Sequence, residues 1–261
     1  MVARTHRQWN VIEFIDLGPE FIGGKAVPPL QLLRYAGTQP EPDSSLWVLS
    51  GFAGSSKKDF FLAGLLQKAV QTGVINPVAD LFMTPLMNPA SDPKNASLNV
   101  DGVDLSKAFP LADEYVEQKE IRSLVSWAKR IAPKAIISLT TGASTLIRHS
   151  ENVPAEIISR LSELCECPAL LWGTEPEVNG AAPNQLGSWC QRQGIAWIEF
   201  SVEESKKNFQ EIAETEWKKH IGSALKWLAE GHRFNPPKEE PLIMKHMIVP
   251  VLDIPPEFAN L

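Results

Sequence analysis

The histidines are the first residues to consider for chemistry, because imidazole is the commonest protein ligand of transition metals. The chain has five of them, at His6, His149, His220, His232 and His246. None stands in a His-x-x-Glu, His-x-x-His or His-x-His arrangement, so their spacing predicts no local metal site. The sequence also holds no Gly-x-Ser-x-Gly elbow, phosphate-binding glycine loop or dinucleotide fingerprint. The sequence therefore offers no recognised local motif for catalysis, and its polar side chains must be considered one by one.

Such polar groups gather in the segment from Ser97 to Pro110, which reads Ser-Leu-Asn-Val-Asp-Gly-Val-Asp-Leu-Ser-Lys-Ala-Phe-Pro. This segment resembles the Gly-Val-Asp-Leu-Asn-Arg-Asn-Phe-Pro signature of the zinc carboxypeptidases, in particular the branch that contains the bacterial murein peptide amidases. Further segments resemble that family in the same order, over roughly residues 29 to 202; they are Leu49–Ser56, Asn88-Pro89, Ser138-Leu139-Thr140, Gly187–Cys190 and Ile195–Phe200.

The resemblance implies a catalytic zinc site whose ligands this chain has lost. A catalytic zinc needs three protein ligands and one open position for water. The family's first His, its Glu and its second His align with Ala53, Ser56 and Thr140, none of which carries an imidazole or a carboxylate. We therefore expect no zinc and no other cofactor. His149, nine residues beyond Thr140, is a conceivable displaced ligand, but a surface histidine is the favoured interpretation.

The substrate-gripping residues that the resemblance implies are replaced as well. The family's Arg falls at Ser97, and Ser106-Lys107 stands in place of its Asn-Arg pair. The expected Tyr between positions 173 and 186 is missing, since the chain has tyrosines only at Tyr35 and Tyr115.

Three positions keep their family residue: Glu199 at the vestigial general-base position, Asn99, and Asp104, which in the family orients the first zinc-binding His. Glu199, Asp104 and Lys107 each have an ordinary structural alternative. Glu199 could face solvent or pair with a lysine at a strand end, Asp104 could cap its loop through backbone N–H groups, and Lys107 could be solvated. The resemblance predicts instead that Ser97, Asn99, Asp104, Ser106 and Lys107 bind a ligand.

The size of the zinc effect decides between residual hydrolysis and none. Zinc lowers the pKa of its bound water from about 15.7 to about 7, so its loss removes roughly eight to nine powers of ten in available hydroxide. A general base such as Glu199 typically recovers about 10² to 10⁴. The loss of available hydroxide without zinc is therefore far larger than the rate that a general base can recover.

Composition is that of an ordinary globular protein, with 44% hydrophobic and 21% charged residues among 261. The net charge is −6, and no run of Lys or Arg alternates with aromatic residues, which argues against nucleic acid as a partner. No segment approaches the length of a membrane span, and the first ten residues are too polar for a signal peptide, so we expect a cytoplasmic location. Three cysteines are read as reduced thiols.

The elements that must position these residues alternate between strand and helix, which predicts an α/β/α sandwich around a mixed, mostly parallel sheet. Short apolar runs predict the strands, and apolar stripes of helical period predict the helices. The predicted strands are 11–15, 30–35, 47–52, 81–84, 135–139 and 195–200, and the predicted helices are 57–71, 112–130, 154–165, 184–192 and 203–230. Between residues 85 and 110 a long polar loop is expected, of the kind that is usually functional.

Residues 1–232 are predicted to form one carboxypeptidase-like domain, and residues 233–261 a Pro-rich extended tail. The favoured function is that of a pseudoenzyme which binds a peptide-like or carboxylate ligand, or serves a regulatory role. One alternative is an active hydrolase with a rearranged metal site built from Glu199, Asp104 and His149. The other is a scaffold with a vestigial cleft.

Overall fold

The structure is a computed structural model of the chain. It describes residues 8–15, 21–22, 25–26, 28–39, 45–52, 57–89, 91, 98–111, 115–142, 144–172, 185–203, 214–215, 217, 221–231 and 234. The predicted tail from residue 233 lies outside this range except for Phe234, so its extended form stays a prediction.

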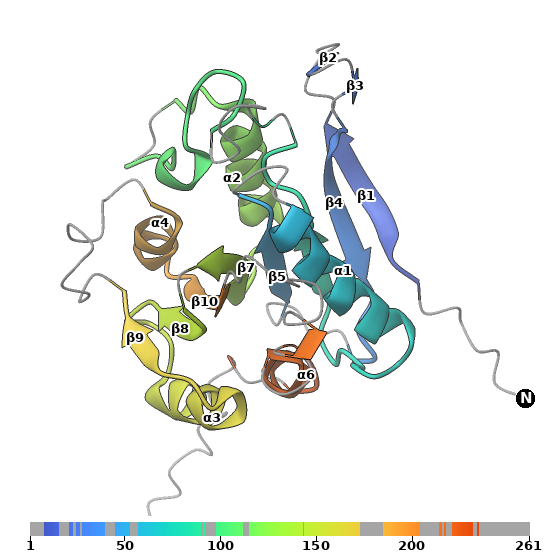
Figure 1. The fold of residues 1–261 in the computed structure, drawn as a ribbon, viewed down its shortest axis with the longest axis vertical. Coiled ribbons are helices and arrows are strands. Elements are labelled where there is room, and N and C mark those ends of the chain that lie inside the picture. The colour runs from blue at the N-terminus through green and yellow to red at the C-terminus, as the bar shows by residue number, and fades with distance from the viewer. Residues whose placement is uncertain are drawn as a thin grey trace, which may run out of the picture.

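One eight-stranded sheet, in the order β1-β4-β6-β5-β7-β10-β8-β9, forms the centre of the domain. Four of the seven neighbouring pairs are parallel, namely β6 with β5, β5 with β7, β7 with β10, and β8 with β9, and the other three are antiparallel. The strands of this sheet are β1 (Asn10–Ile15), β4 (Leu30–Tyr35), β5 (Leu46–Ser50), β6 (Leu81–Thr84), β7 (Ala135–Gly142), β8 (Leu146–His149), β9 (Ala169–Leu171) and β10 (Ala196–Glu203). In Figure 1, β1 and β4 stand at one edge and β8 and β9 at the other, while β2 (Phe21–Ile22) and β3 (Lys25–Ala26) form a small separate hairpin.

Helices cover both faces of this sheet, which confirms the predicted α/β/α class. The described helices are α1 (Lys57–Gln71), the short 3-10 helix η1 (Leu105–Lys107), α2 (Lys119–Ile131), α3 (Ala155–Cys165), α4 (Leu186–Arg192) and α6 (Gly222–Ala229). Side chains of α1, α3 and α6 share one apolar cluster with one face of the sheet, whereas those of α2 and α4 share a second cluster with the other face. None of the described helices is long and apolar enough to cross a membrane.

Alternation along the central strands decides which side chain faces which layer. In β5, Val48 belongs to the cluster under α1 and α6, and its neighbour Trp47 to the cluster under α2 and α4. All five residues of β5 are buried, as expected for a parallel strand covered on both faces. In β10, Ile198 and Trp197 divide between the clusters in the same way. Glu199, two residues beyond Trp197, therefore lies on the α2 and α4 side.

Two of the predicted helices begin later in the structure than the sequence suggested. The predicted helix 112–130 is α2, which starts only at Lys119, because Gln118 is extended and its side chain accepts a hydrogen bond from Asn99 Nδ2 at 2.7 Å. The predicted helix 203–230 is wrong at its start, since Glu203 ends strand β10. Its last part, α6, is confirmed, and residues 204–213 lie outside the described range.

Strands β8 and β9 were absent from the sequence prediction. Strand β9 has only three residues, and two of the four residues of β8 are Arg148 and His149, so neither strand forms a recognisable apolar run. Strand β8 nevertheless matters for the site, because it pairs antiparallel with β10.

The three cysteines are free thiols, as predicted. Burial raises the pKa of the Cys190 thiol, and a hydrogen bond with Cys167, aided by burial, raises that of Cys165. Both groups are therefore neutral and unreactive at ordinary pH.

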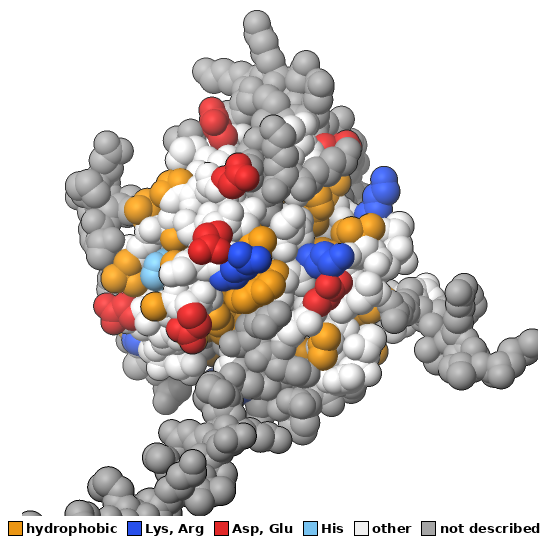
Figure 2. All heavy atoms as spheres, turned by 90° about the horizontal axis from the view of Figure 1, so that it is seen from below, with side chains coloured by type: hydrophobic (Ala, Val, Ile, Leu, Met, Phe, Trp, Pro, Cys, Tyr) orange, Lys and Arg blue, Asp and Glu red, His pale blue; other side chains and the backbone are white. Residues whose placement is uncertain are grey.

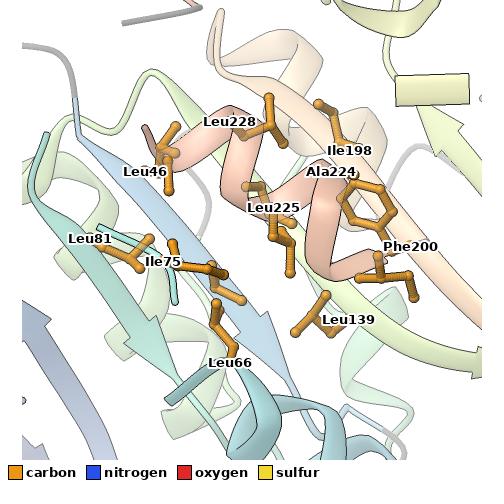
Figure 3. Packing of buried hydrophobic residues seen from close by; sticks show 14 of the residues in the cluster. Leu46, Leu66, Ile75, Leu81, Leu139, Ile198, Phe200, Ala224, Leu225 and Leu228 are labelled. Carbon is orange, nitrogen blue, oxygen red and sulfur yellow. The ribbon is translucent and has the colours of Figure 1, made fainter. Parts of the chain in front are cut away.

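Docking of α6 onto the sheet can be tested by truncating one side chain. Figure 3 shows Leu225 and Leu228 of α6 directed toward side chains of the strands, and Leu225 is only 3% exposed. Leu225→Ala should lower the free energy of unfolding by about 2–5 kcal/mol, because it leaves a cavity in the core. The matched control Lys226→Ala, on the exposed side of the same helix, should change it by less than about 0.5 kcal/mol. Urea unfolding measures both, and equal effects would contradict the observed packing.

Candidate functional site

A pocket of about 220 Å³ lies where the parallel strands β7 and β10 approach their carboxyl ends. Open α/β sheets bind ligands outside this edge, because loops from several strands converge there. The lining residues come from the strands, from the turns that follow β5 and β9, from η1 and from the start of α4; they are Phe52, Ser106, Ser138, Thr140, Arg148, Trp172, Gln185, Leu186, Gly187, Trp197 and Glu199.

Two indole rings form much of the apolar wall. Trp172 and Trp197 meet edge to face with 5.0 Å between ring centroids, a favourable arrangement for aromatic pairs. Their N–H groups have partners, since Trp197 Nε1 donates to Ser138 Oγ at 3.0 Å and Trp172 Nε1 to Ser188 Oγ at 3.3 Å. The wall is thus fixed by hydrogen bonds as well as by packing.

Gly187 lets α4 approach this wall closely. A Cβ atom at position 187 would lie 2.9 Å from two ring carbons of Trp197 and 3.3 Å from Trp172. Real Cβ atoms essentially never come that near, so any larger residue would push the helix or the indoles away. Close packing against the two indoles therefore explains why glycine stands at the first position of the Gly-Ser-Trp-Cys segment.

Glu199 and Arg148 form an ion pair in the pocket. Register places them directly opposite each other on the antiparallel strands β10 and β8. Arg148 Nη1 donates to Glu199 Oε1 at 2.7 Å, a distance typical of charge-assisted hydrogen bonds. The two side chains are 24% and 17% exposed, so the pair is largely but not fully withdrawn from water. The general-base position is thus occupied by a carboxylate already bound to a guanidinium.

No local pattern in the sequence indicates Arg148 as a site residue. Its partner is 51 residues away along the chain, and their contact depends on a strand too short to predict. The sequence pointed instead to the neighbouring His149, which alternation places on the opposite face of β8. His149 Nδ1 lies 3.1 Å from the backbone oxygen of Ser150. The useful signal would have been a basic residue directly before that histidine in a short apolar run.

The polar loop brings some of the predicted ligand-binding residues near the pocket. Ser106 lines it, whereas Lys107 is not part of the described lining and pairs with Asp104 at 3.1 Å. Asp104 Oδ1 also accepts hydrogen bonds from Ser106 N at 3.1 Å and Ser106 Oγ at 2.6 Å. Asp104 thus caps η1, which is the structural role weighed for it from the sequence.

Asn99 is buried and organises the same loop from within. Its Oδ1 accepts hydrogen bonds from Asp101 N at 3.1 Å and Val103 N at 3.0 Å, and its Nδ2 donates to Gln118. Glu120 lies close by and is also buried; desolvation raises the pKa of its carboxyl, while hydrogen bonds from its own backbone and from Asn99 oppose the shift. Asn99 therefore supports the loop in this structure, and its predicted contact with a ligand stays a prediction.

The residues present do not fit a zinc ion of the carboxypeptidase type. Thr140 lines the pocket, while Ala53, Ser56 and Ser97 lie outside the described residues. By sequence, neither Ala53 nor Ser56 offers an imidazole or a carboxylate. Within the described part of the chain, no three His, Cys, Asp or Glu side chains come together to hold a metal, so Glu199, Asp104 and His149 do not form a rearranged site.

The fold is that of the zinc carboxypeptidases. A metallo-carboxypeptidase from Burkholderia cenocepacia superposes with a TM-score of 0.60 at 13% identity, covering 83% of this chain and 63% of that chain. Murein-tripeptide amidase MpaA from Escherichia coli O157 superposes with a TM-score of 0.57 at 17% identity, covering 90% of this chain and 97% of that chain. A metallo-carboxypeptidase from Pseudomonas aeruginosa gives 0.57 at 16% identity, covering 84% and 65%.

This chain thus spans less than two thirds of the length of the two metallo-carboxypeptidases and nearly all of the amidase. At such identities the likeness concerns the fold alone. No protein-family model matches the sequence, and no curated protein matches it.

Metal content provides a direct test of the site. Because Ala53, Ser56 and Thr140 offer no zinc ligand, we expect the purified protein to hold well under one zinc per chain by elemental analysis. A chelator should leave its melting temperature unchanged, since no binding energy is lost on metal removal. A stoichiometric zinc, with a melting temperature that falls in chelator, would overturn this account of the site.

Proposed function

We propose that this chain is a carboxypeptidase-like pseudoenzyme, a protein that binds a small peptide-like or carboxylate ligand in the pocket and does not hydrolyse it by zinc chemistry. The observation that carries the proposal is the ion pair between Arg148 and Glu199. A general base must take a proton from water, and a carboxylate oxygen that already accepts a 2.7 Å hydrogen bond from a guanidinium is poorly placed to do so.

The pocket itself supports binding. Its aromatic side chains offer apolar contact, and its hydroxyls at Ser106, Ser138 and Thr140 offer orienting hydrogen bonds. Ligand sites typically combine such walls with a few polar groups. Lys107 pairs with Asp104 and lines a different hollow, together with Tyr115 and Glu117, so its charge is not part of the described lining of this pocket. A carboxylate held by Lys107 alone should be bound more weakly and less selectively than one held by an Arg, because an ammonium lacks the planar fork of a guanidinium.

The face that Figure 2 shows gives no indication of another function, such as nucleic-acid binding, among the described residues. There, acidic and basic side chains of the described residues lie among one another, with hydrophobic side chains between them. A basic field of the kind that follows a phosphate backbone is not seen among the described residues of that face. The expectation that nucleic acid is not a partner stays a prediction.

Hydrolysis and its repair form one test. The wild-type protein should not cleave C-terminal or murein-type peptide substrates measurably in a mass-spectrometric assay. The triple variant Ala53→His, Ser56→Glu and Thr140→His should gain zinc by elemental analysis yet remain inactive. Arg148 would still hold Glu199, and misplacement of about 1 Å can cost two powers of ten in rate. Wild-type turnover that disappears in Glu199→Gln would refute the pseudoenzyme proposal.

Binding forms a second test. Small peptides with a free carboxylate should bind with Kd values in roughly the micromolar to millimolar range, measured by calorimetry or NMR. Affinity should fall as salt rises, because screening weakens charge contacts that are partly exposed. If a broad panel of such ligands shifts no resonance of Arg148, Glu199 or Thr140, the pocket is vestigial and the proposal fails.

A further inference from the structure

The described lining of the pocket carries one positive and one negative side chain, and these are bound to each other. Arg148 and Glu199 are its ionisable members, while the others are apolar or neutral polar residues. The described part of the lining therefore has no net formal charge, but it has a strong local dipole between the guanidinium and the carboxylate, whose bonded atoms lie 2.7 Å apart.

Such a dipole selects ligands by the arrangement of their charges. A ligand with only a carboxylate is attracted by Arg148 and repelled by Glu199 from almost the same distance, so little net attraction remains. A ligand with only an ammonium is attracted by Glu199 and repelled by Arg148, so it also gains little net attraction. A ligand that carries both groups on the same carbon atom can place its carboxylate beside Arg148 and its ammonium beside Glu199, and it then gains from both contacts.

The position of the pair makes this selection effective. Both residues stand on paired strands of the sheet, so their separation is set by the register of β8 and β10 rather than by a loop. Charged groups fixed in advance bind a matching ligand without further ordering cost. Their exposure of 24% and 17% leaves part of each side chain accessible, while the surrounding walls limit screening by water.

The rest of the pocket indicates a small ligand with an apolar side chain. Its volume of about 220 Å³ is below the roughly 300–1,000 Å³ that drug-sized ligands occupy. Phe52, Leu186 and the indoles of Trp172 and Trp197 line it. The faces of such rings also attract an ammonium group.

We propose that the pocket binds a free, zwitterionic amino acid with an apolar side chain, and that Arg148 and Glu199 together select it over the ends of peptides. This inference rests on the proposed function, because it names the ligand class of the same pocket. The inference assigns the contact with the ligand carboxylate to Arg148, which lines the pocket. The sequence had pointed to Lys107 for that contact, but Lys107 is not part of the described lining and pairs with Asp104.

Blocking one end of the ligand at a time tests the selection. Calorimetry at neutral pH on the full chain compares L-phenylalanine with N-acetyl-L-phenylalanine, which resembles the C-terminal residue of a peptide, and with L-phenylalaninamide, which resembles the N-terminal residue. The free amino acid should bind at least about ten-fold more tightly than either derivative, because each derivative loses one charge contact and keeps one repulsion.

Two single variants should change the preference in opposite directions. Arg148→Gln removes the positive charge from the described lining and keeps the carboxylate of Glu199, so L-phenylalaninamide should become the tightest of the three ligands. Glu199→Gln leaves an unbalanced guanidinium, so N-acetyl-L-phenylalanine should become the tightest. The control Arg160→Gln removes an exposed ion pair with Glu163 on α3, outside the pocket, and should leave all three affinities unchanged. Thermal unfolding checks each variant, and the near-isosteric Glu199→Gln still decides the matter if Arg148→Gln does not fold.

The outcomes separate this inference from the function on which it rests. If the N-acetyl derivative binds the wild type as tightly as the free amino acid, the zwitterion inference is overturned and the carboxylate-binding function stands. If none of the three ligands, nor any carboxylate-bearing peptide, binds, both are overturned. Unchanged ligand preference in a folded Glu199→Gln variant also refutes the role of the pair.

Discussion

The burial of the central strands on both faces is the constraint on which the rest of the structure depends. Strand β5 has no exposed residue, and β7 and β10 alternate between the two apolar clusters that α1, α3 and α6 form on one side and α2 and α4 on the other. Because these strands run parallel, their carboxyl ends meet at one edge. The pocket forms at that edge, where polar side chains such as Thr140 and Glu199 line it.

At this edge the proposed function depends on which cation faces Glu199. A metal site needs several imidazole and carboxylate ligands around a cation. Here, within the described residues, the cation is the Arg148 guanidinium, held by register opposite Glu199. A guanidinium supplies fixed charge and directed hydrogen bonds, but it does not generate hydroxide as zinc does. Under the proposed function, this edge of the sheet holds a ligand and does not cleave it.

The sequence predicted the elements whose pattern is long or strongly apolar. Helix α1 and strand β6 have the predicted bounds, because their apolar residues alone define them. Helix α2 begins later than predicted because a tertiary contact, from Asn99 to Gln118, holds the preceding residues extended. The absence of an imidazole or carboxylate at Ala53, Ser56 and Thr140 could be read from residue types alone. Arg148 could not, because its role depends on a pairing across 51 residues that no local pattern records.

One measurement tests the central claim most directly: a crystal structure of the protein grown with zinc, with anomalous diffraction recorded at the zinc edge. The account predicts no anomalous peak in the pocket and a guanidinium nitrogen of Arg148 within hydrogen-bonding distance of a Glu199 carboxylate oxygen, as in the 2.7 Å contact described above. A strong peak near Thr140 and Glu199, with Arg148 turned away, would contradict it.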